Sequence, residues 1–240
     1  MTGGDAVFHG KYKAVTFSYD DGVTQDKRLI EILDRYGLKC TFNINSELLG
    51  REGSLVRGGV TVQHNKLFPE EIKAVYKSHE VAVHTLTHPN LTSLTDDNEI
   101  IRQVEQDRLN LSRLVGYEVV GMAYPGGGVN NNEHVAELVK NNTGVKYART
   151  TCSTYGFDKQ TCLYRFNPTV YHVMENDIDK LVELGKQFIE LKLETPQIFY
   201  IWGHSYEFDI QNTWDYFENF CRLISGREDI FYGTNKEVLL

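Results

Sequence analysis

Short apolar runs alternate with amphipathic stretches along this chain of 240 residues. Residues 13–18 form an apolar, strand-like run. Residues 24–36 have the hydrophobic spacing of a helix, with Thr24 as its cap and Gly37 at its end. By the same criteria, further strands are predicted at 39–45, 80–84, 119–123, 145–148 and 197–202, and further helices at 68–78, 95–115, 131–141, 177–193 and 213–225.

Strands and helices therefore follow one another without a linker rich in Pro or Ser, so residues 1–240 are expected to form a single α/β domain. Two stretches depart from the alternation. The Gly-rich stretch 50–59 is expected to be a loop, and 151–171 to hold one short strand around 162–166. A series of βα units closes into a parallel barrel or opens into a doubly wound sheet, and in both the active site lies at the carboxyl ends of the strands.

The composition narrows the possible partners. The formal net charge is −8 and no run of Lys or Arg occurs, which makes nucleic acid and anionic membrane surfaces unfavourable partners. Residues 1–5 lack a signal-peptide pattern and no stretch has the character of a transmembrane segment. The protein is expected in the cytoplasm on the chain as given, or outside it if a leader was removed. Cys152 and Cys162 could close a loop, but buried free thiols are expected.

Polar residues follow directly after four of the predicted strands. The four clusters are Asp20-Asp21, the segment HTLTH at 84–88, the segment YPGGG at 124–128 and the segment WGHSY at 202–206. Because the strands are expected to run parallel, their carboxyl ends meet at one mouth of the sheet or barrel. The clusters are therefore predicted to face one another.

The first two clusters have the composition of a metal site. Two histidines four residues apart, His84 and His88, together with one carboxylate make a His₂-carboxylate set, the pattern of a catalytic Zn²⁺ site with open positions. At the end of a strand, adjacent side chains point to opposite sides, so one of Asp20 and Asp21 can hold a cation while the other faces a substrate. A solvated acidic turn is the alternative for this pair.

Together these segments resemble the polysaccharide deacetylase family, also called the NodB-homology or carbohydrate esterase family four domain. The matching stretches are Thr16–Gly22, His84–His88, Ala123–Gly127 and Ile201–His204, in the family's order, between Lys13 and His204. The resemblance implies a distorted (β/α) barrel and a metal-dependent hydrolase. The metal is expected to be Zn²⁺, with Co²⁺, Ni²⁺, Fe²⁺ or Mn²⁺ also able to bind such a set.

The resemblance also implies roles for individual residues. It implies Asp20 as the catalytic base, Asp21, His84 and His88 as metal ligands, Gly126 beside Tyr124 and Pro125 as the backbone donor of an oxyanion site, and His204 as the acid. The chemistry is consistent, since an amine leaving group must be protonated as it departs and a histidine can supply that proton. Trp202 is preferred over Tyr19, Tyr206 and Trp214 as the aromatic that binds a sugar face.

The chain departs from the family pattern at two places. Ala123 stands where the family often has an arginine that orients the base, and Arg149 is predicted to take its place, with Arg165 as the second candidate. No Asp-x-x-Asp-Trp segment occurs near 150–158. Glu207 and Asp209 could serve the acid histidine in its stead, although a solvated turn is the favoured interpretation for both.

The predicted function is removal of acetyl groups from N-acetylated sugars of a chitin-like or peptidoglycan-like oligo- or polysaccharide. Two alternatives remain: an O-acetyl esterase acting on xylan-like chains, and a catalytically silent carbohydrate-binding protein on the same fold. A metal phosphodiesterase is not supported, because no Lys/Arg cluster or phosphate-binding helix start is present.

Overall fold

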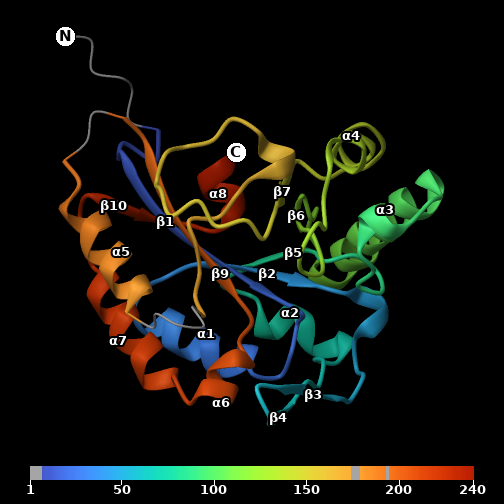
Figure 1. The fold of residues 1–240 in the computed structure, drawn as a ribbon, viewed down its shortest axis with the longest axis horizontal. Coiled ribbons are helices and arrows are strands. Elements are labelled where there is room, and N and C mark those ends of the chain that lie inside the picture. Colours follow the sequence, from blue (N-terminus) through green and yellow to red (C-terminus); the bar gives the residue numbers. More distant parts are fainter. Residues whose placement is uncertain (1–6, 174–178, 193–194) are drawn as a thin grey trace.

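The computed structural model describes residues 7–173, 179–192 and 195–240. Its core is a curled, parallel sheet with β1 (Lys13–Asp20) at the centre, between β2 (Cys40–Ile44) and β9 (Gln197–Gly203). On one side of β1 the sheet continues through β2 to β5 (Glu80–Val83), β6 (Gly121–Ala123) and β7 (Tyr147–Arg149) (Figure 1). On the other side, β8 (Val170–Tyr171) pairs with β9. A further strand, β10 (Ile230–Tyr232), pairs with the first residues of β1.

One segment connects the two outer sides of this sheet. The Phe166 N–H donates to the Ala148 carbonyl at 2.9 Å and, three residues later, the Thr169 N–H donates to the Tyr200 carbonyl at 2.8 Å. The chain at 166–171 therefore bonds to β7 at one end and to β9 at the other. The prediction of a distorted (β/α) barrel is confirmed, with this single segment in the place of full strands.

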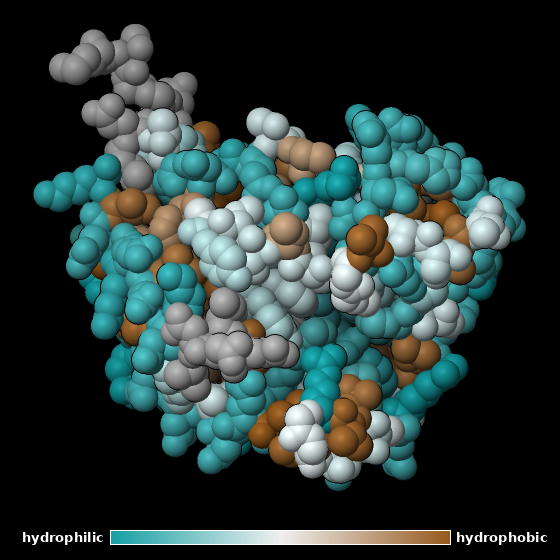
Figure 2. Space-filling model, in the orientation of Figure 1, coloured by the Kyte–Doolittle hydropathy of each residue, from teal (hydrophilic) through white to brown (hydrophobic). Residues whose placement is uncertain are grey.

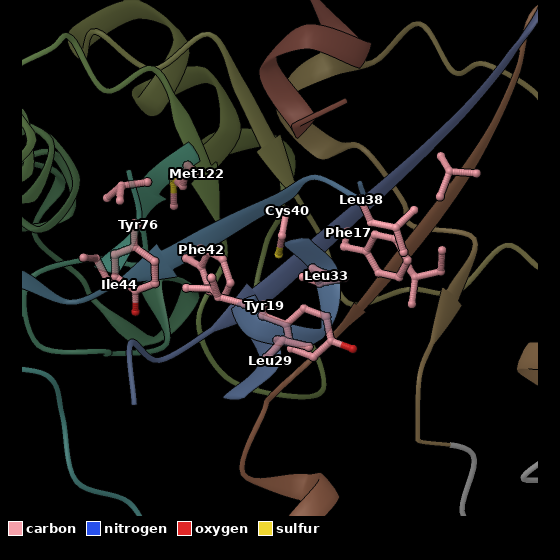
Figure 3. Close-up of a cluster of buried hydrophobic side chains, with 14 of the residues drawn as sticks. Phe17, Tyr19, Leu29, Leu33, Leu38, Cys40, Phe42, Ile44, Tyr76 and Met122 are labelled. Carbon is pink, nitrogen blue, oxygen red and sulfur yellow. The ribbon is translucent and has the colours of Figure 1, made fainter. Parts of the chain in front are cut away.

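Helices surround the sheet (Figure 1). They are α1 (Asp26–Arg35), α2 (Ile72–Val75), α3 (Asp97–Val115), α4 (Glu133–Asn142), α5 (Lys180–Glu190), α6 (Glu207–Gln211), α7 (Trp214–Ile224) and α8 (Asn235–Leu239). The apolar face of β1 packs against α1: Figure 3 shows Leu29 and Leu33 of α1 close to Phe17 and Tyr19 of β1. Burial of each such side chain stabilises the fold by about 2 kcal/mol.

The opposite face of β1 is polar and points into the barrel. Side chains alternate along a strand, so Thr16, Ser18 and Asp20 share this face. The Asn235 Nδ2 of α8 donates to the Thr16 hydroxyl at 2.8 Å, and the Asn43 Nδ2 donates to both the Ser18 hydroxyl and Asp20 at 2.8 Å. Because α8 bonds to Thr16 in the amino half of the strand, it leaves the carboxyl end of the strand, at Asp20, uncovered.

Several predicted elements differ from the structure. The predicted loop 50–59 was wrong: it contains β3 (Ser54–Arg57), and β4 (Val60–Gln63) completes an antiparallel hairpin. Gly58 and Gly59, at φ 56° and 79°, form the turn, a conformation that favours glycine and that two-residue hairpins require. The strand expected around 162–166 was also wrong, since Leu163–Arg165 is a 3₁₀ turn.

One predicted helix is shorter in the structure, and some elements of the structure were not predicted. Helix 68–78 is a 3₁₀ turn, Pro69–Glu71, followed by the single turn of α2. Positions 177, 178 and 193 of the predicted helix 177–193 lie outside the described residues. β10 and α8 were not predicted. All four cysteines are free thiols, but Cys152 and Cys162 are exposed rather than buried. No helix in the described ranges is both long and apolar enough to cross a membrane.

Candidate active site

The carboxyl ends of the strands surround a cleft of about 630 Å³. The principal site residues predicted from the sequence line it, except Pro125 and Arg149. It is not lined by the secondary candidates Tyr19, Arg165, Glu207, Asp209 and Trp214. The β3–β4 hairpin contributes Leu55 and Arg57 to the lining, and its exposed Val56 and Val60 lie outside it. Figure 2 shows apolar side chains gathered over this hairpin at the lower edge of the view, with the surface hollowed above them.

Asp21, His84 and His88 bring one ligand atom each to within 4.8 Å of one another. The Asp21 Oδ1 lies 3.6 Å from the His88 Nε2 and 3.9 Å from the His84 Nε2. The His84 Nδ1 lies 2.9 Å from the Ala123 carbonyl, which can only accept, so Nδ1 carries the proton and Nε2 keeps its lone pair. One carboxylate and two imidazoles with this tautomer fit a divalent cation such as Zn²⁺.

The backbone turns sharply at and beside these candidate ligands. Asp21, Thr85 and His88 have φ values of 86°, 67° and 64°, in the left-handed region that non-glycine residues rarely adopt. The Thr85 hydroxyl accepts from the His88 N–H at 3.1 Å, which closes the loop after β5. This turn brings the His84 and His88 rings to 4.8 Å between centroids. Such strain is characteristic of functional sites.

Asp20 is buried beside this set. One terminal nitrogen of Arg149 lies 2.6 Å from the Asp20 Oδ1 and 2.5 Å from Oδ2, and the Asn43 Nδ2 donates to Oδ1 at 2.8 Å. The Arg149 side chain has no exposed surface. The structure thus places the predicted arginine on the predicted base. Arg165, the second candidate, donates instead to Asn131 on the surface.

His204 lies on the other side of the cleft and is paired with Glu207. Its Nδ1 is 3.1 Å from the Glu207 Oε2. Burial lowers the pKa of His204, but Glu207, Asp21 and Asp20 together outweigh burial and raise this pKa to about 9, with Glu207 contributing most of the rise. His204 therefore carries a proton at neutral pH, as a general acid must.

Glu207 is buried, so its predicted place in a solvated turn was wrong. Only 3% of its surface is exposed. It accepts from the His172 Nε2 and from Arg57, both at 2.9 Å, and from the Tyr171 hydroxyl. Burial raises the pKa of Glu207, yet the neighbouring histidines hold it well below its ordinary value. Glu207 is the first residue of α6, one turn after His204.

Asp209 matches the solvated interpretation instead. It is exposed and accepts from Gln25 at 3.1 Å and from the Trp214 indole at 2.8 Å. No hydrogen bond or ion pair joins it to His204 in the described part of the chain.

The segment after β6 forms a tight turn at the rim. Gly126 has a φ of 81°, which favours glycine, and its carbonyl accepts from the Asn130 Nδ2 at 2.8 Å. Tyr124 is buried, and its hydroxyl donates to the Tyr164 carbonyl at 2.8 Å. Tyr124 thus supports the turn, and Gly126 presents backbone to the cleft.

Trp202 is packed rather than open. Tyr171 stacks on it with centroids 4.5 Å apart, and the Arg149 guanidinium lies 4.4 Å from its ring centroid. Only 7% of Trp202 is exposed. Trp202 thus lines the cleft with little exposed surface and packs against the arginine that binds Asp20, and its role as a sugar platform stays a prediction.

Several residues of the site were not found from the sequence. His64 and Lys66 reach Asp21 from the segment after β4, and His172 contacts both Glu207 and Tyr19. No local pattern marks these residues, because each acts on a group far away in the chain. A histidine and a lysine beside a turn are ordinary surface composition.

A buried carboxylate below the cleft gives a test of stability. Asp26 accepts from the hydroxyls of Tyr76 and Ser205, both at 2.6 Å. Burial outweighs these bonds and raises the pKa of Asp26 from 3.8 to about 7. From about pH 4 to 7 the folded protein thus holds a proton that the unfolded chain releases, so the free energy of unfolding falls as pH rises, by roughly 4 kcal/mol from this group.

Asp26→Asn should remove this contribution, because an amide does not titrate and can still bond both hydroxyls. We expect the loss of stability between pH 4.5 and 7.5 to be roughly 3–4 kcal/mol smaller in the variant than in the wild type. Urea unfolding of both metal-free proteins at the two pH values measures this difference. Parallel pH dependences would show that Asp26 is already ionised at pH 4.5.

The chain was compared with known proteins. The family model described as "Polysaccharide deacetylase" matches residues 9–148. Similar solved structures include a putative polysaccharide deacetylase from Mycobacterium smegmatis, with a TM-score of 0.67 and 15% identity, covering 96% of this chain and 90% of that one. Another is peptidoglycan deacetylase PdaC from Bacillus subtilis, with a TM-score of 0.53 and 14% identity, covering 95% and 90%.

A third neighbour shows that the fold does not guarantee activity. It is a family 4 carbohydrate esterase pseudoenzyme from Bacillus anthracis, with a TM-score of 0.53 and 18% identity, covering 95% of this chain and 66% of that one. None of the curated proteins matches the sequence. At these identities, the solved structures establish the fold, and the activity must be argued from the site.

Proposed function

This chain belongs to the polysaccharide deacetylase family, and we propose that it is a metal-dependent hydrolase that removes acetyl groups from N-acetylated sugars of an oligo- or polysaccharide. The observation that most supports this is that three kinds of chemical group lie around one cleft. A His₂-carboxylate set, a second carboxylate held by a buried arginine, and a protonated histidine lie around the same space. Zn²⁺ is the metal we propose, with Co²⁺, Ni²⁺, Fe²⁺ and Mn²⁺ as alternatives.

Asp20 is proposed as the general base. When held by Asp21, His84 and His88, a divalent metal supplies Lewis-acid polarisation of the substrate. Asp20 accepts the proton that the attacking water loses as its oxygen adds to the amide carbon. Arg149 and Asn43 hold the Asp20 carboxylate at fixed distances, so it needs no reorganisation before accepting the proton.

His204 is proposed as the general acid. The carbonyl oxygen becomes negative as water adds, and the backbone N–H of Gly126 is the proposed donor to it. As the C–N bond then breaks, the nitrogen takes a proton from the His204 imidazolium and leaves as a free amine. Glu207, with smaller contributions from Asp21 and Asp20, keeps that imidazole charged at neutral pH.

The charged state of His204 favours an amide substrate over an ester. An alkoxide or phenolate leaves with less help than an amine, so an O-acetyl esterase would gain less from a buried Glu207 that raises the pKa of His204. A silent carbohydrate-binding protein would have no use for Asp20 and Arg149 beside the ligand set. Burying that ion pair is expensive and gains nothing for binding alone.

An acetate-release screen tests the proposal. Chelator-treated and Zn²⁺-reconstituted protein would be assayed on N-acetylglucosamine oligomers, peptidoglycan fragments and acetylated xylan. We expect acetate from an N-acetylated substrate, with activity falling by roughly 100-fold or more after chelation and returning with Zn²⁺. Release from acetylated xylan alone would favour the esterase, and no release from any substrate would favour the binding protein.

A further inference from the structure

Asp21 is held at three of its polar groups. Its N–H donates to the Asn43 carbonyl at 2.9 Å, and its own carbonyl accepts from the Lys66 Nζ at 2.7 Å. Its Oδ2 lies 3.0 Å from the Nε2 of His64. The remaining oxygen, Oδ1, lies 3.6 Å from the His88 Nε2, 3.9 Å from the His84 Nε2 and 3.6 Å from the Lys66 Nζ. Asn43 and Lys66 thus hold the backbone of Asp21, at its N–H and at its carbonyl, in the left-handed conformation with φ 86°.

His64 is itself fixed before any ligand binds. Its backbone N–H donates to the Gly53 carbonyl at 2.8 Å. Its ring packs edge-on against Tyr206, with centroids 5.0 Å apart and an interplanar angle of 82°. A carboxylate oxygen only accepts, so the Nε2 of His64 carries the proton that bonds Asp21. The side chain is 18% exposed and lines the cleft.

We propose that His64 is a positioning residue for the metal carboxylate. Its Nε2–H holds Oδ2 of Asp21, so that Oδ1 stays directed at His84 and His88, and this sets the affinity of the site for a divalent metal. Without that bond, the carboxylate is restrained about χ2 mainly by Lys66, whose Nζ lies 3.6 Å from Oδ1, and metal binding must order it further. The inference rests on the metal site of the proposed function. It adds a residue on the β3–β4 side of the cleft that family motifs do not mark.

The test measures metal affinity without substrate. Chelator-stripped protein would be titrated with Zn²⁺ in competition with a chromophoric chelator. His64→Ala should weaken binding by about 10- to 100-fold, the usual effect of losing a partner behind a metal ligand. His64→Gln should stay within about threefold of the wild type, because its amide N–H can donate from the position of Nε2. The thermal unfolding of each metal-free variant would show that it folds.

His134 provides the matched control. Its Nε2 makes the same kind of contact with a carboxylate, 2.8 Å from the Asp97 Oδ1, but on the surface. His134→Ala should leave Zn²⁺ affinity unchanged. Wild-type affinity in His64→Ala would overturn the proposal. Equal losses in the Ala and Gln variants, with an altered visible spectrum of the Co²⁺-loaded protein, would also overturn it, because His64 would then be a direct ligand.

Failure of this inference can be told apart from failure of the proposed function. A wild type that binds Zn²⁺ but releases no acetate would overturn the deacetylase proposal and leave the comparison of His64 variants valid. A wild type that binds no divalent metal would overturn both.

Discussion

Replacing Asp20 with asparagine should lower the kcat for acetate release by about 10³-fold or more, while the protein still binds its metal. Asparagine keeps the shape of the side chain and an oxygen for Asn43, but it cannot take a proton from water. The ligands Asp21, His84 and His88 are untouched. The measurement pairs steady-state acetate release with a Zn²⁺ titration of the same protein.

The variant leaves Arg149 as a buried cation without its carboxylate. Breaking such a pair costs about 3–5 kcal/mol, so the Asn variant is expected to unfold at lower urea concentration. Retained Zn²⁺ binding at the assay temperature shows that the site is intact. Asp97→Asn, a change at an exposed carboxylate, is the control and should keep full activity. If Asp20→Asn retains a tenth of the wild-type kcat or more, Asp20 is not the base.

His204→Ala should reduce amide cleavage by about 10²- to 10⁴-fold and cleavage of an aryl acetate by less than about tenfold. The amine of a deacetylated sugar leaves only with a proton, and His204 is the protonated group beside the cleft. A phenolate leaves without one. Both substrates would be assayed on one preparation of Zn²⁺-loaded enzyme, with kcat and KM determined separately. Equal losses on the two substrates would rule out the acid role.

Glu207→Gln provides a second variant on the same group. Glu207 is the largest of the contributions, with Asp21 and Asp20, that raise the pKa of His204 to about 9 against its burial, so the proposed acid stays protonated up to mildly alkaline pH. Without the carboxylate the pKa of His204 falls, and the alkaline limb of the kcat profile for the amide should move to lower pH. A purely structural role of Glu207 would lower activity at every pH and leave the limb where it was.

The elements were predictable where their determinants are local. The strands that became β1 and β2 alternate apolar and polar residues, those that became β5 and β9 have apolar runs, and the helix patterns of α3 and α7 are long and regular. Short elements were missed or misplaced, among them β10 and the hairpin β3–β4. β3 and β4 are largely exposed and lack the apolar run that marked β5, which is equally short, so their pairing with each other selects them.

The site residues fall into the same two groups, those in local sequence motifs and those recognised only through contacts with distant segments. The metal set and the proposed base lie at the ends of two strands, in short motifs whose spacing can be read directly. Arg149 was anticipated only as a candidate, because the Asp20 it binds lies 129 positions earlier. Glu207 was taken for a solvated residue, since its sequence neighbours do not show that His172, Arg57 and Tyr171 enclose it.

The sequence by itself determined the α/β architecture, the family and the residue types that gather at the carboxyl ends of the strands. Only the tertiary structure decided how these residues are held: Arg149 on Asp20, His64 on Asp21 and Glu207 on His204. The reason is physical. Strand ends and motif spacing are local properties of the backbone. Burial and charge pairing, which orient a carboxylate and set the pKa of a histidine, arise when distant segments exclude water from the same cleft.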